Sequence, residues 1–301
     1  YDKRMVLGCI NTGGGWGILI PPSILMILYS LITGVSVGQM FAAGVLPGIL
    51  LMVLTCIYII VRCYFQPHLA PALPKDERAS WREKMLALRA VILPIIIVVV
   101  TLGSIIAGVT TPTEAAAVGV FGALVSALVY RKFSWELMRD ASIRTFKLTG
   151  MIMWILFAAH AFSAAYQSMG AQELIEGMIT GIPGGPWAVI ITMMVIVFFL
   201  AMVLDPVGIM LITLPVFLPI VQSMGFDPVW FGILFVINME IGYMTPPFGF
   251  NLFYLKGVVP PSITMKDIYV SVIPFVLVEI VGLALIMIFP EIATYLPDLM
   301  F

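Results

Sequence analysis

Charged residues are scarce in this chain of 301 residues: Asp, Glu, Lys and Arg make up 10% of it, against about 25% in an average soluble domain. Hydrophobic residues make up 61%, and the mean hydropathy is +1.11. This balance excludes a soluble globular protein, and it leaves no basic surface for a nucleic-acid partner. We therefore expect an all-α polytopic membrane protein in a lipid bilayer.

Residues and motifs for catalysis are also missing. The three cysteines, Cys9, Cys56 and Cys63, have no paired or metal-type spacing, and there are only two histidines. The sequence lacks HExxH, GxSxG and paired intramembrane aspartates, so we expect no enzyme activity. It also lacks GxxxxGK[ST], which argues against ATP as an energy source, and a filter motif, which argues against an ion channel.

Apolar runs of spanning length fill most of the chain. A membrane-spanning helix needs about 20 such residues, and we place the runs at 5–33, 41–61, 90–109, 114–130, 148–167, 187–221, 229–255 and 268–290. The 187–221 run is too long for one crossing and is interrupted at Asp205-Pro206, which predicts a re-entrant hairpin. All 15 Lys and Arg residues then fall on one side of the membrane. Basic residues favour the cytoplasmic side, so the C-terminus is predicted to be periplasmic.

Two of these runs are broken in the same way. The stretch "GILIPPSILMILY" occupies 17–29, and "GYMTPPFGFNLFY" occupies 242–254. A constant offset of 225 pairs the following residues: Asp2 with Asp227, Gly17 with Gly242, Pro21-Pro22 with Pro246-Pro247, and Tyr29 with Tyr254. The two copies cross in opposite directions, which predicts an inverted-topology repeat with discontinuous helices. Only the second copy follows a hairpin, so we expect the chain to be N-terminally truncated.

The paired breaks predict a binding site. Unwound backbone inside a bilayer persists only within protein or beside a water-filled cavity, and matched breaks in inverted halves mark a transporter's ligand site. Asp205 is either a functional intramembrane carboxylate or an N-cap of the returning helix, and the sequence leaves both open. Thr245 is favoured as an ion ligand. Asn238 could serve either a substrate or the backbone.

Four ordered motifs carry a family resemblance across essentially the whole chain: "GGGWGILIPPS", "TPTEAAAVGV", "LDPVGIMLITLPVFLPI" and "MTPPFGFNLF". Together they resemble the large (M, DctM-like) membrane subunit of TRAP transporters, the tripartite ATP-independent periplasmic family. The resemblance implies Na⁺-coupled import of a small organic acid, a carboxylate-bearing solute, across the bacterial inner membrane by an elevator-type motion. It also implies two partners, a small four-helix Q membrane subunit and a periplasmic solute-binding protein.

The resemblance also implies site residues. One Na⁺ site would use the tip from Ala201 to Asp205 with Gly242, Thr245 and the Phe248 backbone, and the other would use the first break. The expected sodium-binding residues are therefore Ala201, Asp205, Gly242, Thr245, Phe248, Gly13, Gly14 and Gly17. The expected substrate-binding residues are Thr12, Gly15, Trp16, Pro21, Asn238 and Pro246. Ala201, Gly15 and Trp16 differ from the residues that are common in the family at these positions. The preferred solute therefore stays open.

The predicted organisation has three parts. Residues 1–61 hold the first broken helix and the following span, 62–186 hold scaffold spans with an interfacial helix at 133–147, and 187–301 hold the second repeat with its hairpin. The alternative function is a stand-alone divalent-anion or proton-coupled carrier that works without a binding protein. Uptake by the membrane subunits alone would favour that alternative.

Overall fold

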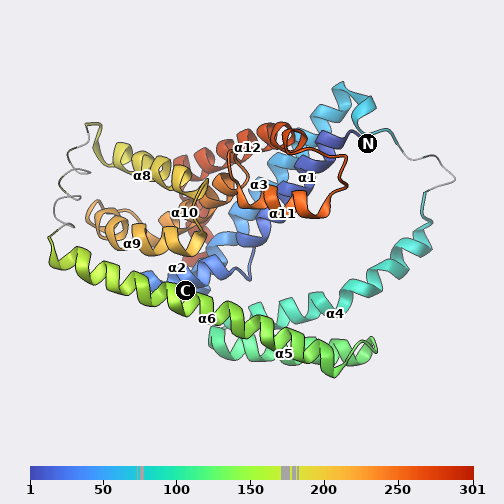
Figure 1. Cartoon of the computed structure of the whole chain (residues 1–301), viewed down its shortest axis with the longest axis horizontal. Coiled ribbons are helices and arrows are strands. Elements are labelled where there is room, and N and C mark those ends of the chain that lie inside the picture. The colour runs from blue at the N-terminus through green and yellow to red at the C-terminus, as the bar shows by residue number, and fades with distance from the viewer. Residues whose placement is uncertain (73, 75–77, 171–176, 178–180, 182) are drawn as a thin grey trace. The chain divides into compact units, whose positions relative to one another are not determined.

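The computed structural model describes residues 1–301 except 73, 75–77, 171–176, 178–180 and 182 (Figure 1). Every regular element in this described part is helical. The chain divides into two compact units: a larger one of Tyr1–Ala70 with Trp154–Phe301, and a smaller one of Pro71–Met153. The three-part division that the sequence suggested stays a prediction, and the end of its 62–186 segment lies partly outside the described residues.

The smaller unit contains α4 (Trp81–Ile106), α5 (Pro112–Val129) and the start of α6 (Trp135–Ser168). Helices α4 and α5 pack on one another. The sequence placed the whole of 62–89 in a loop, but α4 begins at Trp81, because Ser80 and Glu83 form a capping box at its N-terminus. The interfacial helix expected at 133–147 and the span at 148–167 form one continuous helix, α6. Its interfacial position stays a prediction.

The larger unit confirms that both Pro-Pro runs are broken. The first contains α1 (Lys3–Gly15), the 3-10 helix η1 (Trp16–Ile18) and α2 (Ile24–Thr33). The second contains α10 (Pro228–Tyr243) and α11 (Phe250–Val258). Corresponding aspartates, Asp2 and Asp227, cap α1 and α10 through two backbone N–H groups each. Proline ends a helix because it lacks an N–H and clashes with the preceding turn.

The 187–221 run forms two helices, α8 (Gly185–Ala201) and α9 (Pro206–Ser223), which pack side by side as a hairpin (Figure 1). The sequence correctly places the interruption at Asp205-Pro206. Re-entry of this hairpin into the membrane stays a prediction.

Long helices complete the larger unit. Helix α3 (Val37–Phe65) packs on α12 (Met265–Ile288) and on α13 (Glu291–Met300). A short 3-10 helix, η2 (Pro67–Leu69), follows α3. Both α3 and α12 contain an internal proline, Pro47 and Pro274.

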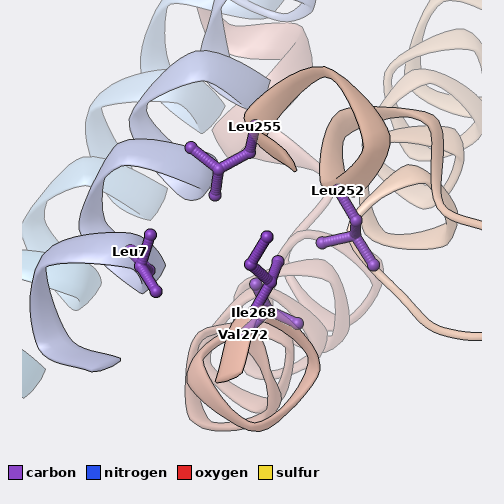
Figure 2. Close-up of a cluster of buried hydrophobic side chains, with 5 residues drawn as sticks. All are labelled: Leu7, Leu252, Leu255, Ile268 and Val272. Atoms are coloured by element: carbon purple, nitrogen blue, oxygen red, sulfur yellow. The ribbon is translucent and has the colours of Figure 1, made fainter. Parts of the chain in front are cut away.

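Helix α10 lies at the centre of the larger unit, and every residue from Val229 to Tyr243 is buried. A helix that is apolar on all sides is buried on all sides. It packs against α8, α12, α3 and several shorter elements. A second core cluster joins α1, α11 and α12, as Figure 2 shows: Leu7 meets Leu252, Leu255, Ile268 and Val272. The helix before the first break, α1, and the helix after the second break, α11, are thereby packed together on α12.

Five helices of the described part are long and apolar enough to cross a membrane, and six are if the two parts of α4, bent by 49°, count as one span. Large hydrophobic side chains are exposed along many of them, such as Ile60 on α3 (67%) and Leu277 on α12 (59%). This exposure suits helices whose outer faces contact lipid. The fold is that of a polytopic helical membrane protein.

Candidate functional site: a cavity between two helix breaks and a hairpin tip

Three segments that are far apart in the sequence meet around one cavity of about 400 Å³. The first break contributes Gly17, Ile18 and Pro22, and the hairpin tip contributes Asp205, Pro206 and Val207. The second break and the helix after it contribute Tyr243, Phe250, Asn251 and Tyr254. The structure therefore brings together the two breaks and the tip that the sequence singled out.

Three helices begin at this cavity. Helix α2 starts at Ile24, α9 at Pro206 and α11 at Phe250, and all three residues line the cavity. A helix N-terminus presents spare backbone N–H groups and the positive end of the helix dipole. Such ends favour an anion, as in phosphate and carboxylate sites. The described lining residues include no Lys or Arg, so the N-termini of α2 and α11 are the positive features of the cavity wall, while the N-terminus of α9 is capped by Asp205.

The first break is shaped by a serine. Ser23 is the N-cap of α2, where its hydroxyl accepts a hydrogen bond from the Met26 N–H at 3.3 Å. The same hydroxyl donates to the carbonyl oxygen of Ile18 at the end of η1. The Pro21-Pro22 bond between them is cis. Ser23 thus ties together the two helix ends that flank the break.

The second break is shaped by Thr245 and Gly249. The Thr245 hydroxyl donates to the carbonyl of Ile241 at 2.6 Å, and its N–H donates to the carbonyl of Gly242 at 3.1 Å. The Pro246-Pro247 bond is cis. Gly249 has φ +48°, in the left-handed region that favours glycine, immediately before α11 begins. The oxygen of Thr245 keeps its lone pairs, because its hydrogen bond to Ile241 uses only the proton.

Asp205 is the N-cap of α9. Its Oδ2 accepts hydrogen bonds from the N–H groups of Val207 at 3.0 Å and Gly208 at 3.3 Å. The residue also lines the cavity, so capping and a role toward a ligand are both compatible with its position. No described residue donates to the carbonyl oxygens of 202–204, which precede it in the tip. Oxygen atoms of this kind are the ligands that hard cations prefer.

Ala201 and Gly242 close one side of the tip. Both are buried, and the Cα of Gly242 rests on the methyl group of Ala201. A Cβ at position 242 would collide with that methyl group. The carbonyl ends of α8 and α10 are therefore brought together by the absence of a side chain at residue 242.

Several expected site residues lie away from the cavity. Asn238 donates to the Met194 carbonyl on α8 at 2.6 Å and is buried there, while the Phe248 side chain is 54% exposed. Thr12 and Gly15 are buried in α1, and Pro21 is buried in the first break. Pro246 is partly buried in the second break. Gly13 and Gly14 are exposed on α1, and a Cβ built on either would meet no described atom within 4 Å. Gly17, in contrast, lines the cavity.

Sequence reasoning missed one feature of this region. Glu240 on α10 and Glu279 on α12 are both fully buried, and the Trp16 indole N–H donates to Glu279 Oε1 at 3.0 Å. Neither glutamate is among the site residues that the sequence predicts. The sequence feature that could have indicated Glu279 is its position as an acidic residue inside the apolar run at 268–290. The described residues contain no group of three or more His, Cys, Asp or Glu side chains that could hold a metal ion.

Broken helices around a cavity, with carbonyl ends and helix N-termini facing it, define a polytopic membrane protein of the discontinuous-helix type. The chain belongs to the DctM component family of tripartite ATP-independent periplasmic (TRAP) transporters, whose family model matches residues 1–292. It is therefore a large permease subunit for secondary solute transport, a multi-pass inner-membrane protein of a tripartite system. Such a system includes a small membrane subunit and a periplasmic binding protein.

Characterised relatives extend over the whole chain. It is 34% identical over 303 residues to the C4-dicarboxylate TRAP transporter large permease protein DctM of Pseudomonas aeruginosa, covering 99% of this chain and 68% of that protein. It is 34% identical over 323 residues to the DctM protein of Vibrio cholerae, covering 100% of this chain and 69% of that protein. It is 31% identical over 306 residues to the ectoine TRAP transporter large permease protein TeaC of Halomonas elongata, covering 100% of this chain and 69% of that protein.

Proposed function

We propose that this chain couples the import of a small organic acid to the entry of Na⁺, with the 400 Å³ cavity as the solute site. The observation that carries this proposal is the meeting of the N-termini of α2 and α11 at one cavity whose described lining residues include no basic side chain. Helix α9 also begins there, but Asp205 already accepts from its first N–H groups. N-terminal N–H groups suit a carboxylate. The name of the Pseudomonas relative refers to C4-dicarboxylates, which is the same chemical class.

We assign the coupling ion to the tip and the second break. The carbonyls of 202–204 have no described donor, and the Thr245 hydroxyl oxygen and the Asp205 carboxylate lie in the same two segments. Na⁺ is a hard cation that takes such oxygens. Ala201, Gly242 and Phe248 would contribute through their backbone. A second Na⁺ would use the first break at Gly13, Gly14 and Gly17.

The substrate would contact residues of both breaks. We place Thr12, Gly15, Trp16, Pro21, Asn238 and Pro246 in the support of the site behind its lining residues, and we add Asn251 and Tyr243 because they line the cavity. The inverted repeat, the elevator-type movement of the hairpin region, a separate four-helix Q subunit and a periplasmic C-terminus belong to the same proposal. They rest on the sequence offset of 225 and on the family membership.

The decisive experiment is solute uptake into proteoliposomes that contain the whole permease and its small membrane subunit. A panel of labelled carboxylates is supplied with the periplasmic binding protein, with and without an inward Na⁺ gradient at a fixed membrane potential. We expect uptake to require both the Na⁺ gradient and the binding protein. Uptake that is equal without Na⁺ would refute the coupling, and uptake without the binding protein would favour the stand-alone carrier.

Substitutions at two threonines test where the coupling Na⁺ binds. Thr245 and Thr213 both donate their hydroxyl to the carbonyl four residues earlier, at 2.6 Å and 2.7 Å. Only Thr245 lies in a break, whereas Thr213 is buried inside α9. We expect Thr245→Val to raise the Na⁺ concentration for half-maximal uptake about tenfold or more, which corresponds to about 1.4 kcal/mol. Thr213→Val should leave it unchanged, and equal effects would place the ion elsewhere.

A further inference from the structure

Two fully buried carboxyl groups lie outside the cavity and have no role in the proposed transport cycle. Glu240 is on α10 and Glu279 is on α12, two helices that pack on one another, and both side chains have 0% exposure. The two carboxyl groups lie against consecutive residues of the first run, because Glu240 packs on Gly15 and Glu279 accepts from the Trp16 indole. The only hydrogen bond assigned to them is the one from Trp16 Nε1 to Glu279 Oε1, at 3.0 Å. The other three carboxyl oxygens have no partner among the described residues.

Two bare negative charges cannot stay together in this place. A buried unpaired carboxylate costs several kcal/mol or more in an apolar interior, and a neighbouring like charge adds to the cost. No Lys, Arg or His is assigned an interaction with either group in the described part of the chain. A small cation must therefore neutralise the pair at least in part.

The space around Glu240 favours a proton over a metal ion. Its carboxyl group rests against the backbone of Gly15, so closely that a Cβ built there would lie 2.6 Å from Glu240 Oε1. A metal such as Na⁺ or Ca²⁺ needs a shell of several oxygens and room for it. A proton needs only two oxygens, and a carboxyl pair supplies them, as in the acid dyads that share one proton.

We propose that Glu240 and Glu279 form a proton-binding site, in which a protonated Glu240 faces a Glu279 carboxylate that Trp16 holds. The proton binds without any other bond being made or broken. Its occupancy is tied to the first break, because Trp16 begins η1 and the next residues, Gly17 and Ile18, line the cavity. This inference does not depend on Na⁺ coupling or on the identity of the solute.

The other titratable groups on neighbouring elements act elsewhere. Helices α8 and α9 carry no titratable side chain within their bounds. Tyr29 on α2 donates to the Pro228 carbonyl at the opposite end of α10, and Tyr243 on α10 interacts with Asp205. Tyr58 on α3 interacts with Arg62, Cys9 and Cys63. The remaining candidates on α1, α3, α11 and α13 are Lys3, Arg4, Cys56, Tyr64, Tyr254, Lys256, Glu291, Tyr295 and Asp298. None of these is assigned an interaction with Glu240 or Glu279.

The site occurs in one half of the chain only. At the offset of 225 that pairs the two breaks, the counterpart of Glu240 is Gly15, the residue against which its carboxyl group packs. The first half therefore provides the space and the second half provides the acid. One proton per chain follows from this arrangement, rather than one for each half.

Trp16 offers a direct readout. We would label the whole permease, purified with its small subunit, with 5-fluorotryptophan and follow the ¹⁹F resonances from about pH 5 to pH 9, the range reached by buried carboxyl groups. Loss of a signal in Trp16→Phe assigns the Trp16 resonance. We expect that resonance to shift in a single step with pH. Trp230 is the internal control, because its buried indole donates to the neutral carbonyl of Ile286 at 3.0 Å and should not move.

Glutamine variants identify which carboxyl groups cause the pH-dependent step of the Trp16 resonance. Glu279→Gln should abolish the step, and Glu240→Gln should change its midpoint by about one pH unit or more, since a strongly interacting pair titrates jointly. Glu291→Gln, an exposed glutamate on α13, should leave the step as it is. A Trp16 resonance that does not respond to pH, or a step that is unchanged in both pair variants, would overturn the proposal. So would a step that disappears in saturating Na⁺, since the pair would then hold Na⁺.

A second measurement keeps the test independent of how the variants fold. In the wild-type protein, infrared difference spectra should show the C=O stretch of a protonated carboxylic acid that disappears at the same midpoint as the Trp16 step. Absence of that band throughout the range would overturn the proposal even if both glutamine variants fail to fold.

Discussion

The Cα of Gly242 lies directly against the methyl group of Ala201, so that the C-terminal ends of α8 and α10 meet without a side chain between them. We expect Gly242→Ala to separate these ends. Overpacking of a tight contact costs about 1–3 kcal/mol, and the thermal unfolding temperature in detergent should fall accordingly. Solute uptake should fall at least about tenfold, because carbonyl positions in the tip shift.

A compensating change tests this explanation. In the double variant Gly242→Ala with Ala201→Gly, the added methyl group takes the place of the removed one, and we expect most of the stability to return. Gly257→Ala is the control, because a Cβ at that position on α11 meets no described atom within 4 Å. A double variant as unstable as Gly242→Ala alone would contradict the proposed contact.

Capping and charge can be separated at Asp205. Asparagine is as good an N-cap as aspartate, whereas alanine loses the cap at a cost of about 0.5–2 kcal/mol. We expect Asp205→Asn to keep the unfolding temperature but to lose most Na⁺-dependent uptake, and Asp205→Ala to lose both. Circular dichroism melts and proteoliposome uptake measure the two effects.

Asp227 is the matched control for that experiment. It caps α10 as Asp205 caps α9, through two backbone N–H groups, but it does not line the cavity. Asp227→Asn should therefore leave both stability and uptake near the wild-type values. Full uptake in Asp205→Asn would show that Asp205 is a cap only.

Tyr29 and Tyr254 occupy equivalent positions in the two runs but have different surroundings. Tyr29 is fully buried, and its hydroxyl donates to the Pro228 carbonyl at 2.6 Å, whereas Tyr254 is 76% exposed. Removing the Tyr29 hydroxyl loses this hydrogen bond, whose net contribution to stability is about 0.5–1.5 kcal/mol. We expect Tyr29→Phe to lower the unfolding temperature and Tyr254→Phe to leave it unchanged. Equal effects would indicate that the bond contributes no net stability.

The breaks were predictable from sequence because proline and glycine act locally. Pro-Pro pairs at 21–22 and 246–247 end helices whatever the rest of the chain does, and Asp205-Pro206 marks a helix start by the same rule. The start of α4 at Trp81 was missed although its signal is equally local. Ser80 and Glu83 form a capping box, but the charges around them resemble a loop when only apolar runs are sought.

The contacts across the fold were not predictable, because they depend on which helices meet. Asn238 lies beside a break in sequence, and its side chain donates to the Met194 carbonyl on α8, a contact that position in the chain does not indicate. The burial of Glu279 likewise follows from the packing of α12 on α10 and from its bond to Trp16, 263 residues away in sequence. Such contacts between distant residues cannot be predicted from a single sequence when it is not known which helices pack together.

The ends of α1 and α12 provide the last prediction. Lys3 Nζ lies 2.9 Å from Asp267 Oδ1, and the Asp267 side chain also accepts from the Thr264 N–H and hydroxyl in a capping box. An ion pair in which the lysine side chain is 54% exposed contributes at most about 1 kcal/mol. Lys3→Met should therefore shift the unfolding temperature little. Asp267→Ala should cost about 0.5–2 kcal/mol more, because it also removes the cap of α12.

Salt and a double variant separate the two contributions at this site. Raising the ionic strength should remove the small difference between Lys3→Met and wild type, because an exposed pair is screened. It should leave the effect of Asp267→Ala almost unchanged, since that effect comes from local hydrogen bonds. Adding Lys3→Met to Asp267→Ala should cause no further loss. A large, salt-sensitive loss in Lys3→Met alone would instead make the ion pair the main link between α1 and α12.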